Sequence, residues 1–172
     1  MSSLMEKLER NSTIKLTSRI QDSKVFGKKD MSPTSVPMVN VALSGRVDGG
    51  ITPGLMVLAG PSKHFKSAFA LLMAAAHQKK HKDGVILFYD SEFGTPPEYF
   101  KSFGIDMDRV VHTPITDVEQ LKFDITKQLD DLTVKDNVCI VIDSVGNLAS
   151  KKEVDDAMDG KSVADMTRAK QL

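Results

Sequence analysis

The chain has 172 residues, of which 41% are hydrophobic and 27% charged, and its formal net charge at pH 7 is zero. This length corresponds to about one domain and is sufficient to bury a hydrophobic core. The single cysteine, Cys139, excludes an internal disulfide and predicts a reducing, cytoplasmic setting, and the sequence has neither an export signal nor an apolar run long enough for a membrane span.

The N-terminal part predicts a helical arm followed by a linker. Apolar residues recur at helical spacing among many charges in residues 3–20, with an interruption near residues 11–13. Residues 21–37 place Gly and Pro among charged, Ser and Thr positions, which is typical of a linker. We therefore divide the chain into an N-terminal helix and linker, residues 1–35, and a core, residues 36–172. The helix either caps its own core or docks on a neighbouring subunit, and periodicity favours neither.

An apolar run at residues 55–59 breaks at Gly60 and gives way to a helical pattern at Lys66, which predicts a strand, a loop and a helix start. Gly60, Lys66 and Ser67 hold three of the four fixed places of the phosphate-loop pattern, and Phe65 stands where that pattern has a second glycine. Backbone N–H groups before a helix N-terminus bind anions, Lys66 adds a positive charge, and Ser67 adds a hydroxyl for magnesium. We predict a nucleotide phosphate site made of Gly60, Pro61, Ser62, Lys63, His64, Phe65, Lys66 and Ser67.

Beyond this loop, hydrophobic periodicity predicts alternating helices and strands. We expect helices over residues 67–82, 96–103 and 118–132, with another from Val163, and strands over residues 85–89, 109–112 and 138–142. A continuous apolar run such as residues 85–89 is typical of a strand that is buried on both faces of a parallel sheet. The order of elements therefore predicts an α/β fold with a mainly parallel sheet flanked by helices.

Two acids follow expected strands, and ligands of open parallel sheets bind at the carboxyl ends of strands. Asp143 would hold magnesium, or would cap a turn. Glu92 would orient and deprotonate an attacking water, or is a solvated loop acid. Tyr99, in the short helix that follows Glu92, would stack on an adenine ring or is an ordinary core residue.

Three segments carry a resemblance to a known family. They read Gly-Pro-Ser-Lys-His-Phe-Lys-Ser at 60–67, Leu-Phe-Tyr-Asp-Ser-Glu-Phe-Gly at 87–94, and Ile-Asp-Ser-Val-Gly-Asn-Leu-Ala-Ser-Lys-Lys-Glu at 142–153. The chain resembles the RecA-like recombinases, and in particular their strand-exchange proteins from T-even-type bacteriophages, in which Phe65 is a subgroup feature. The resemblance runs through essentially the whole chain. It implies a truncated RecA-like P-loop NTPase core, of which this chain holds roughly the first half.

The resemblance also assigns roles to site residues. It implies ATP and Mg²⁺ as cofactors, with Lys66 on the terminal phosphates and Ser67 and Asp143 at the metal. It implies that Glu92 activates the hydrolytic water and that Tyr99 packs on the adenine. The protein would then be a DNA-dependent ATPase of DNA recombination and repair.

Partners follow from the same resemblance. Such proteins form a helical filament on single-stranded DNA and pair that strand with a homologous duplex, and the helical arm would dock on the adjacent subunit. A phage mediator and a single-strand-binding protein are further expected partners, in the cytoplasm of a bacterial host cell. Two alternatives stay open: a nucleotide- or subunit-binding module without turnover, and another phosphate-loop enzyme such as a helicase or a kinase.

A DNA-binding loop is implied at residues 153–162, but this segment carries one Lys against four acids. Affinity for nucleic acid that is independent of sequence comes mainly from clustered cations, so charge alone does not predict DNA binding here. The cations that flank the segment or lie in it, and that would contact phosphates, are Lys151, Lys152, Lys161 and Arg168.

Overall fold

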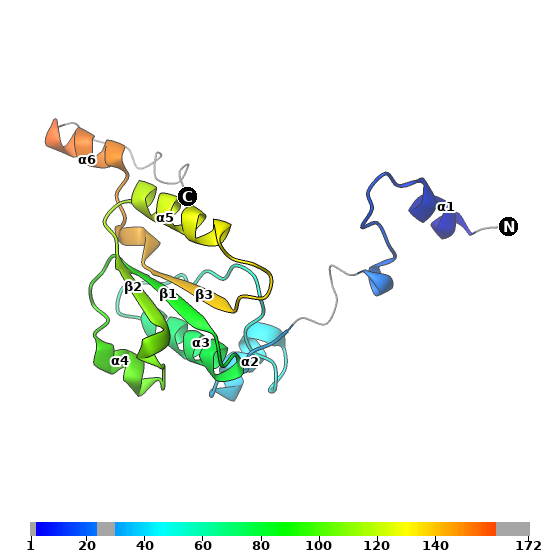
Figure 1. The fold of residues 1–172 in the computed structure, drawn as a ribbon, viewed down its shortest axis with the longest axis horizontal. Helices are drawn as coiled ribbons and strands as arrows, with labels where there is room; N and C mark the ends of the chain where they lie inside the picture. Colours follow the sequence, from blue (N-terminus) through cyan, green and yellow to red (C-terminus); the bar gives the residue numbers. More distant parts are fainter. Residues whose placement is uncertain (1–2, 24–29, 161–172) are drawn as a thin grey trace.

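The computed structural model describes residues 3–23 and 30–160 (Figure 1). Its centre is a parallel sheet of three strands in the order β2-β1-β3, formed by β1 (Val85–Asp90), β2 (Val110–Pro114) and β3 (Val138–Asp143). Because all three strands are parallel, their carboxyl ends meet at one edge of the sheet. The α/β prediction is confirmed.

The helices that periodicity predicted within residues 67–132 are present as α3, α4 and α5, and the helix expected from Val163 lies outside the described residues. The described helices and 3-10 turns are α1 (Leu4–Asn11), η1 (Ile20–Asp22), α2 (Pro37–Ser44), α3 (Lys66–Lys80), α4 (Pro97–Ser102), η3 (Met107–Arg109), α5 (Val118–Asp130), η4 (Val145–Asn147) and α6 (Lys151–Met158). Figure 1 shows α5 on one side of the sheet and α3 and α4 on the other. Among the described residues, no helix is long and apolar enough to cross a membrane.

The sheet separates two hydrophobic cores, because successive side chains of a strand point to opposite faces. The core on the α3 and α4 side contains Leu71, Ala74, Ile86, Phe88, Phe100, Ile105 and Val141. The core on the α5 side contains Leu87, Tyr89, Ile115, Val118, Leu121 and Leu148. Burial on both faces explains why β1 is an uninterrupted apolar run.

Cys139 lies on β3 and packs against the core of the α3 side. Burial raises the pKa of its thiol to about 11. The residue is therefore a protonated thiol at neutral pH and serves as a small hydrophobic side chain, as the sequence predicted.

The expected strand at residues 55–59 is wrong: the structure has no strand there. Leu55 and Val57 are 95% and 77% exposed, so these apolar side chains of the run point to solvent instead of a core. A strand needs a neighbouring chain for its backbone hydrogen bonds, and periodicity reports apolar character without reporting whether a neighbour exists.

Helix α2 was not predicted, and its N-terminal neighbours were assigned to a linker. The signals of the helix were Pro37 at its first turn and Gly45, which ends it in a left-handed conformation with φ 72°. The buried Asn40 side chain holds the preceding segment, since its Oδ1 accepts from the amide of Thr34 at 2.8 Å. Ser32 is also buried and pairs with Ile51 in an isolated antiparallel bridge.

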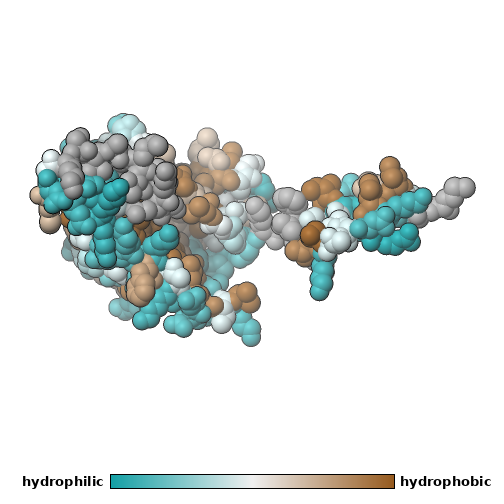
Figure 2. Space-filling view, turned by 90° about the horizontal axis from the view of Figure 1, so that it is seen from above, coloured by the Kyte–Doolittle hydropathy of each residue, from teal (hydrophilic) through white to brown (hydrophobic). Residues whose placement is uncertain are grey.

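The N-terminal arm contains α1, which starts with a capping box formed by Ser3 and Glu6. None of its residues is buried, and Leu4 and Leu8 are 73% and 59% exposed. Figure 2 shows hydrophobic side chains at the surface of this arm, on the right of the view. The helix forms where the sequence predicted it and ends before Ser12, within the predicted interruption.

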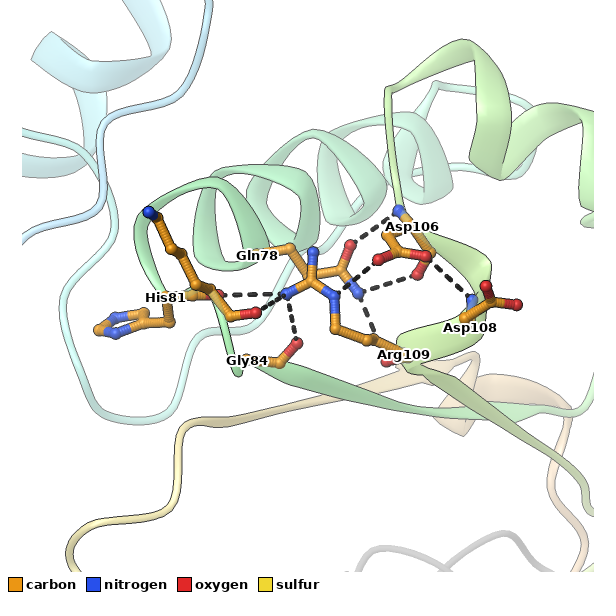
Figure 3. A network of polar contacts seen from close by, with 7 residues as sticks. Gln78, His81, Gly84, Asp106, Asp108 and Arg109 are labelled. Carbon is orange, nitrogen blue, oxygen red and sulfur yellow. Dashed lines mark hydrogen bonds and ion pairs between the residues drawn. The ribbon is translucent and has the colours of Figure 1, made fainter.

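Arg109 ties the end of α3 to the start of the sheet (Figure 3). Its Nη1 donates to the carbonyl oxygens of His81, Lys82 and Gly84 at 3.2, 3.0 and 3.2 Å. Its Nε donates to Asp106 Oδ2 at 2.8 Å. These carbonyls belong to the C-cap residue of α3 and to the turn that leads into β1, so the guanidinium fixes this turn against η3.

Candidate functional site: a phosphate loop and the carboxyl edge of the sheet

The loop before α3 is shaped by two left-handed residues. Lys63 and Phe65 have φ values of 65° and 58°. The general phosphate-loop pattern has glycine at the second of these places because glycine adopts this conformation without a steric penalty. Here Phe65 adopts it, with its side chain 74% exposed, and α3 begins at the next residue.

Backbone amides are the main chemical feature of this loop. Within the described residues, the amide N–H groups from Ser62 to Ala68 donate to no protein acceptor, and the first amide of the helix that does so is Phe69, to Phe65 O at 3.0 Å. The N-cap residue Phe65 also supplies no side-chain cap. Unpaired amides at a helix N-terminus favour an anion, and the helix dipole adds to this preference.

Side chains of the loop add polar groups. Lys66 Nζ donates to Pro61 O at 2.9 Å, so the ammonium lies across the loop from the residue that follows Gly60. His64 Nδ1 lies 2.9 Å from Ser62 O. Ser67 lies at the second position of α3 and is partly buried. These residues lie together in the loop before α3 and in its first turn, and their role in binding phosphate stays a prediction.

Asp143 lies at the end of β3, in register with Asp90 of β1. Its side chain is 8% exposed, and its carboxylate takes part in no hydrogen bond or ion pair with the described residues. A buried carboxylate without protein partners is costly unless a cation or another donor compensates it. It suits Mg²⁺, which keeps several waters and takes few protein ligands. In the described part of the chain, no group of three or more His, Cys, Asp or Glu residues is arranged to hold a metal ion.

Glu92 lies two residues beyond β1 and is exposed. Its Oε1 accepts a hydrogen bond from Ser144 Oγ at 2.7 Å, next to Asp143. Its backbone amide donates to Asp90 Oδ1 at 3.0 Å. The sheet therefore brings Glu92 and Asp143 to neighbouring strand ends, although no hydrogen bond or ion pair among the described residues joins either one to the phosphate loop.

Asp90 was not predicted as a site residue. It is 3% exposed, and its Oδ1 also accepts from the amide of Phe93 at 2.7 Å. His112 on β2 donates from Nε2 to Asp90 Oδ2 at 3.2 Å. This buried carboxylate therefore fixes the turn that carries Glu92.

Ser91 and Ser144 were also missed, although a signal was present. The dipeptide Asp-Ser ends both β1 and β3, at Asp90-Ser91 and Asp143-Ser144. Strand ends that lie in register bring the two serines together, and Ser91 Oγ donates to Ser144 O at 2.7 Å. The repeated Asp-Ser pair at two strand ends is therefore a sequence signal for the contact between Ser91 and Ser144.

Tyr99 lies on α4, where it is partly buried and packs against the core of the α3 side. Its ring meets that of Phe103 edge to face, with centroids 5.3 Å apart. This contact agrees with Tyr99 being an ordinary core residue, and stacking of its ring on adenine stays a proposal.

The proposed DNA contacts divide between described and undescribed residues. Lys151 and Lys152 are exposed in the first turn of α6, and Lys161 and Arg168 lie outside the described residues. Residues 153–158, which the resemblance assigned to a loop, are helical because Ser150 and Glu153 form a capping box.

Comparison with known proteins gives one family and several relatives. Residues 2–171 match the family described as RecA N-terminal domain. The chain is 51% identical to the recombination and repair protein of Enterobacteria phage T4 over 172 residues, which is 100% of this chain and 44% of that protein. It is 32% identical over 137 residues to Protein RecA of Ruminococcus albus, covering 79% of this chain and 32% of that protein. It is also 32% identical over 139 residues to Protein RecA of Corynebacterium urealyticum, covering 77% and 35%. The chain thus spans less than half the length of each of these relatives.

Proposed function

The chain belongs to the RecA family, and on this basis we propose that it binds ATP with Mg²⁺ and acts in DNA recombination and repair as part of a DNA-dependent ATPase. The observation that carries the proposal is the run of unpaired amides from Ser62 to Ala68, at the start of a helix, in the segment that matches the phosphate-loop pattern. An anion with several oxygens fits this run better than a single carboxylate does.

We assign the phosphates of the nucleotide to residues 60–67. The amides of the loop would hold the phosphate oxygens, and Lys66 Nζ, which donates to Pro61 O at 2.9 Å, would exchange this neutral acceptor for a charged one. The ammonium is already charged in its contact with Pro61, and a phosphate oxygen would add the attraction of an opposite charge, which favours phosphate as the acceptor. Tyr99 is the residue we assign to the adenine.

Ser67 and Asp143 are the residues that would hold magnesium. The fit rests on the buried Asp143 carboxylate, which has no partner among the described residues. Bound with the nucleotide, the ion supplies positive charge that neutralises the phosphate oxygens. The hydroxyl of Ser67 and the carboxylate of Asp143 provide the oxygen ligands that this ion prefers.

Glu92 is the residue we assign to hydrolysis. Its Oε1 accepts from Ser144, while Oε2 accepts no hydrogen bond from the described residues. The free oxygen can orient a water and take its proton during attack on the terminal phosphate. Positioning and electrostatics supply most of the catalysis in phosphoryl transfer, so the fixed direction of this carboxylate matters as much as its basicity.

We further propose that the arm of residues 1–35 docks on a neighbouring subunit of a filament. The support is the exposed apolar side chains of Leu4 and Leu8 on an amphipathic helix with no buried residue. Single-stranded DNA and a homologous duplex are the proposed substrates, with Lys151, Lys152, Lys161 and Arg168 as phosphate contacts. A phage mediator and a single-strand-binding protein are proposed partners inside the host cell.

The test is ATP turnover with and without single-stranded DNA. We expect the protein to hydrolyse ATP faster in the presence of DNA, and Lys66→Ala to abolish this activity. Lys135→Ala is the matched control, since Lys135 is exposed and lies before β3, away from the carboxyl edge. Turnover by Lys66→Ala at the control's rate would refute the proposal, and ATP binding without any turnover would favour a binding module instead.

A further inference from the structure

We propose that Ser144 is a positioning residue for ATP hydrolysis, which fixes the direction of the Glu92 carboxylate; this inference rests on the proposed function of Glu92. Ser144 Oγ lies 2.7 Å from Glu92 Oε1. An ionised carboxylate only accepts hydrogen bonds, so the serine proton is committed to this contact. A hydrogen bond to a charged acceptor at this distance is among the stronger ones in proteins.

Ser144 is itself held rigidly by the neighbouring strand end. Its amide donates to Ser91 Oγ at 3.0 Å, and its carbonyl accepts from the same hydroxyl at 2.7 Å. The amide of Ser91 in turn donates to Asp143 O at 2.9 Å. Ser91 thus uses its hydroxyl as both donor and acceptor on the backbone of Ser144, which fixes the backbone from which the Ser144 side chain reaches Glu92.

Glu92 needs such a support because it is exposed and lies beyond the end of its strand. Its backbone is fixed by the buried Asp90 carboxylate, which accepts from the amides of Glu92 and Phe93. This contact fixes the backbone but leaves the rotatable bonds of the Glu92 side chain free. The Ser144 hydroxyl is the one described group that hydrogen-bonds the carboxylate itself.

Ser144 therefore connects the two acids of the site, Asp143 through the backbone and Glu92 through a hydrogen bond. Asp143, assigned to magnesium, and Ser144, which holds the carboxylate of Glu92, are consecutive residues at the end of β3. A base must lie within hydrogen-bonding reach of the water that it activates, and a misplacement of about 1 Å can lower a rate by about 100-fold. We infer that Ser144 sets the distance between the metal ligand and the base.

The experiment measures kcat and KM for DNA-stimulated ATP hydrolysis in four forms of the protein: unaltered, Ser144→Ala, Ser144→Thr and Glu92→Gln. We expect Ser144→Ala to lower kcat by about 10-fold with KM for ATP within about twofold, because one charge-assisted hydrogen bond that acts on the base is lost. Ser144→Thr keeps the hydroxyl and should recover most of the activity.

A double variant separates positioning from general structural support. If Ser144 acts through Glu92, adding Ser144→Ala to Glu92→Gln should cause no further fall in kcat, because residues that act as one unit are not additive. An additive loss in the double variant, or a Ser144→Ala protein with unaltered kcat beside a Glu92→Gln protein with a lowered but measurable kcat, would overturn this inference alone. Absence of turnover in the unaltered protein would overturn the proposed function and this inference with it.

Discussion

Phe65→Gly gives a direct test of the geometry of the phosphate loop. Phe65 has φ 58° and ψ 19°, a left-handed conformation that penalises an ordinary residue by about 1–2 kcal/mol. Glycine removes this penalty but loses about 0.5–1 kcal/mol more conformational entropy on folding. Since the Phe65 side chain is 74% exposed, little packing is lost. We expect Phe65→Gly to leave the free energy of unfolding unchanged or to raise it by up to about 1.5 kcal/mol.

Phe123→Gly is the matched control. Phe123 is 73% exposed, almost the same as Phe65, but lies inside α5. Glycine within a helix lowers stability by about 0.5 kcal/mol relative to a residue such as Phe. The two variants should therefore differ by about 1 kcal/mol, or about 2–4 °C in melting temperature for a chain of this size.

The assay is urea unfolding followed by circular dichroism, supported by a thermal melt. A Phe65→Gly protein that is destabilised as much as Phe123→Gly would refute the claim that backbone conformation sets the preference at this position. Retained ATP binding by Phe65→Gly would show that the phosphate loop keeps its shape with either residue.

The remaining predictions concern the ends of α3 and the metal site. Arg109→Met should lower the free energy of unfolding, measured by urea titration, by about 2–3 kcal/mol, because the two Nη1 N–H groups that donate to three carbonyls are lost. The control Arg46→Met removes only an exposed ion pair with Asp48 and should have no measurable effect. Burial lowers the pKa of His77 in the folded protein below its ordinary value of 6.5. The neutral His77 side chain therefore contributes its full stability above pH 6.5, and this stability is lost as the pH falls through the pKa of the folded state. His77→Gln should reduce the difference between the free energies of unfolding at about pH 7.5 and about pH 5.5. Asp143→Asn should raise the Mg²⁺ concentration needed for half-maximal ATP turnover, and an unchanged requirement would contradict its assignment as a metal ligand.

The layered fold followed from the sequence because β1 and β3 are continuous apolar runs and α3, α4 and α5 supply residues to the two cores. The apolar run at residues 55–59 looks the same to a periodicity argument as β1, yet it has no strand neighbour among the described residues. Periodicity describes one segment alone, whereas a β-strand forms only when a second strand pairs with its backbone groups. Helix α2 was missed for the opposite reason, since its signals lay in Pro37 and Gly45 at its ends.

The sequence predicted that Glu92 and Asp143 lie at strand ends, but it did not predict Asp90 and Ser144, which hydrogen-bond Glu92. Glu92 and Asp143 were assigned because each follows a strand, and strand ends share an edge in a parallel sheet. Asp90 and Ser144 act through contacts that depend on the register between β1 and β3, which no local pattern fixes. The assignment of DNA contacts in residues 151–168 rests on resemblance, and part of that segment lies outside the described residues.

Calorimetric titration with ATP and Mg²⁺, applied to the unaltered protein, to Lys66→Ala and to the control Lys135→Ala, measures directly whether residues 60–67 bind nucleotide. We expect one ATP site, unchanged in the control and weakened by about 10–100-fold in Lys66→Ala, because a charge-assisted hydrogen bond to phosphate is worth roughly 1.5–3 kcal/mol. Equal affinity of the three proteins for ATP, or no binding by the unaltered protein, would contradict the assignment of residues 60–67 as a nucleotide phosphate site.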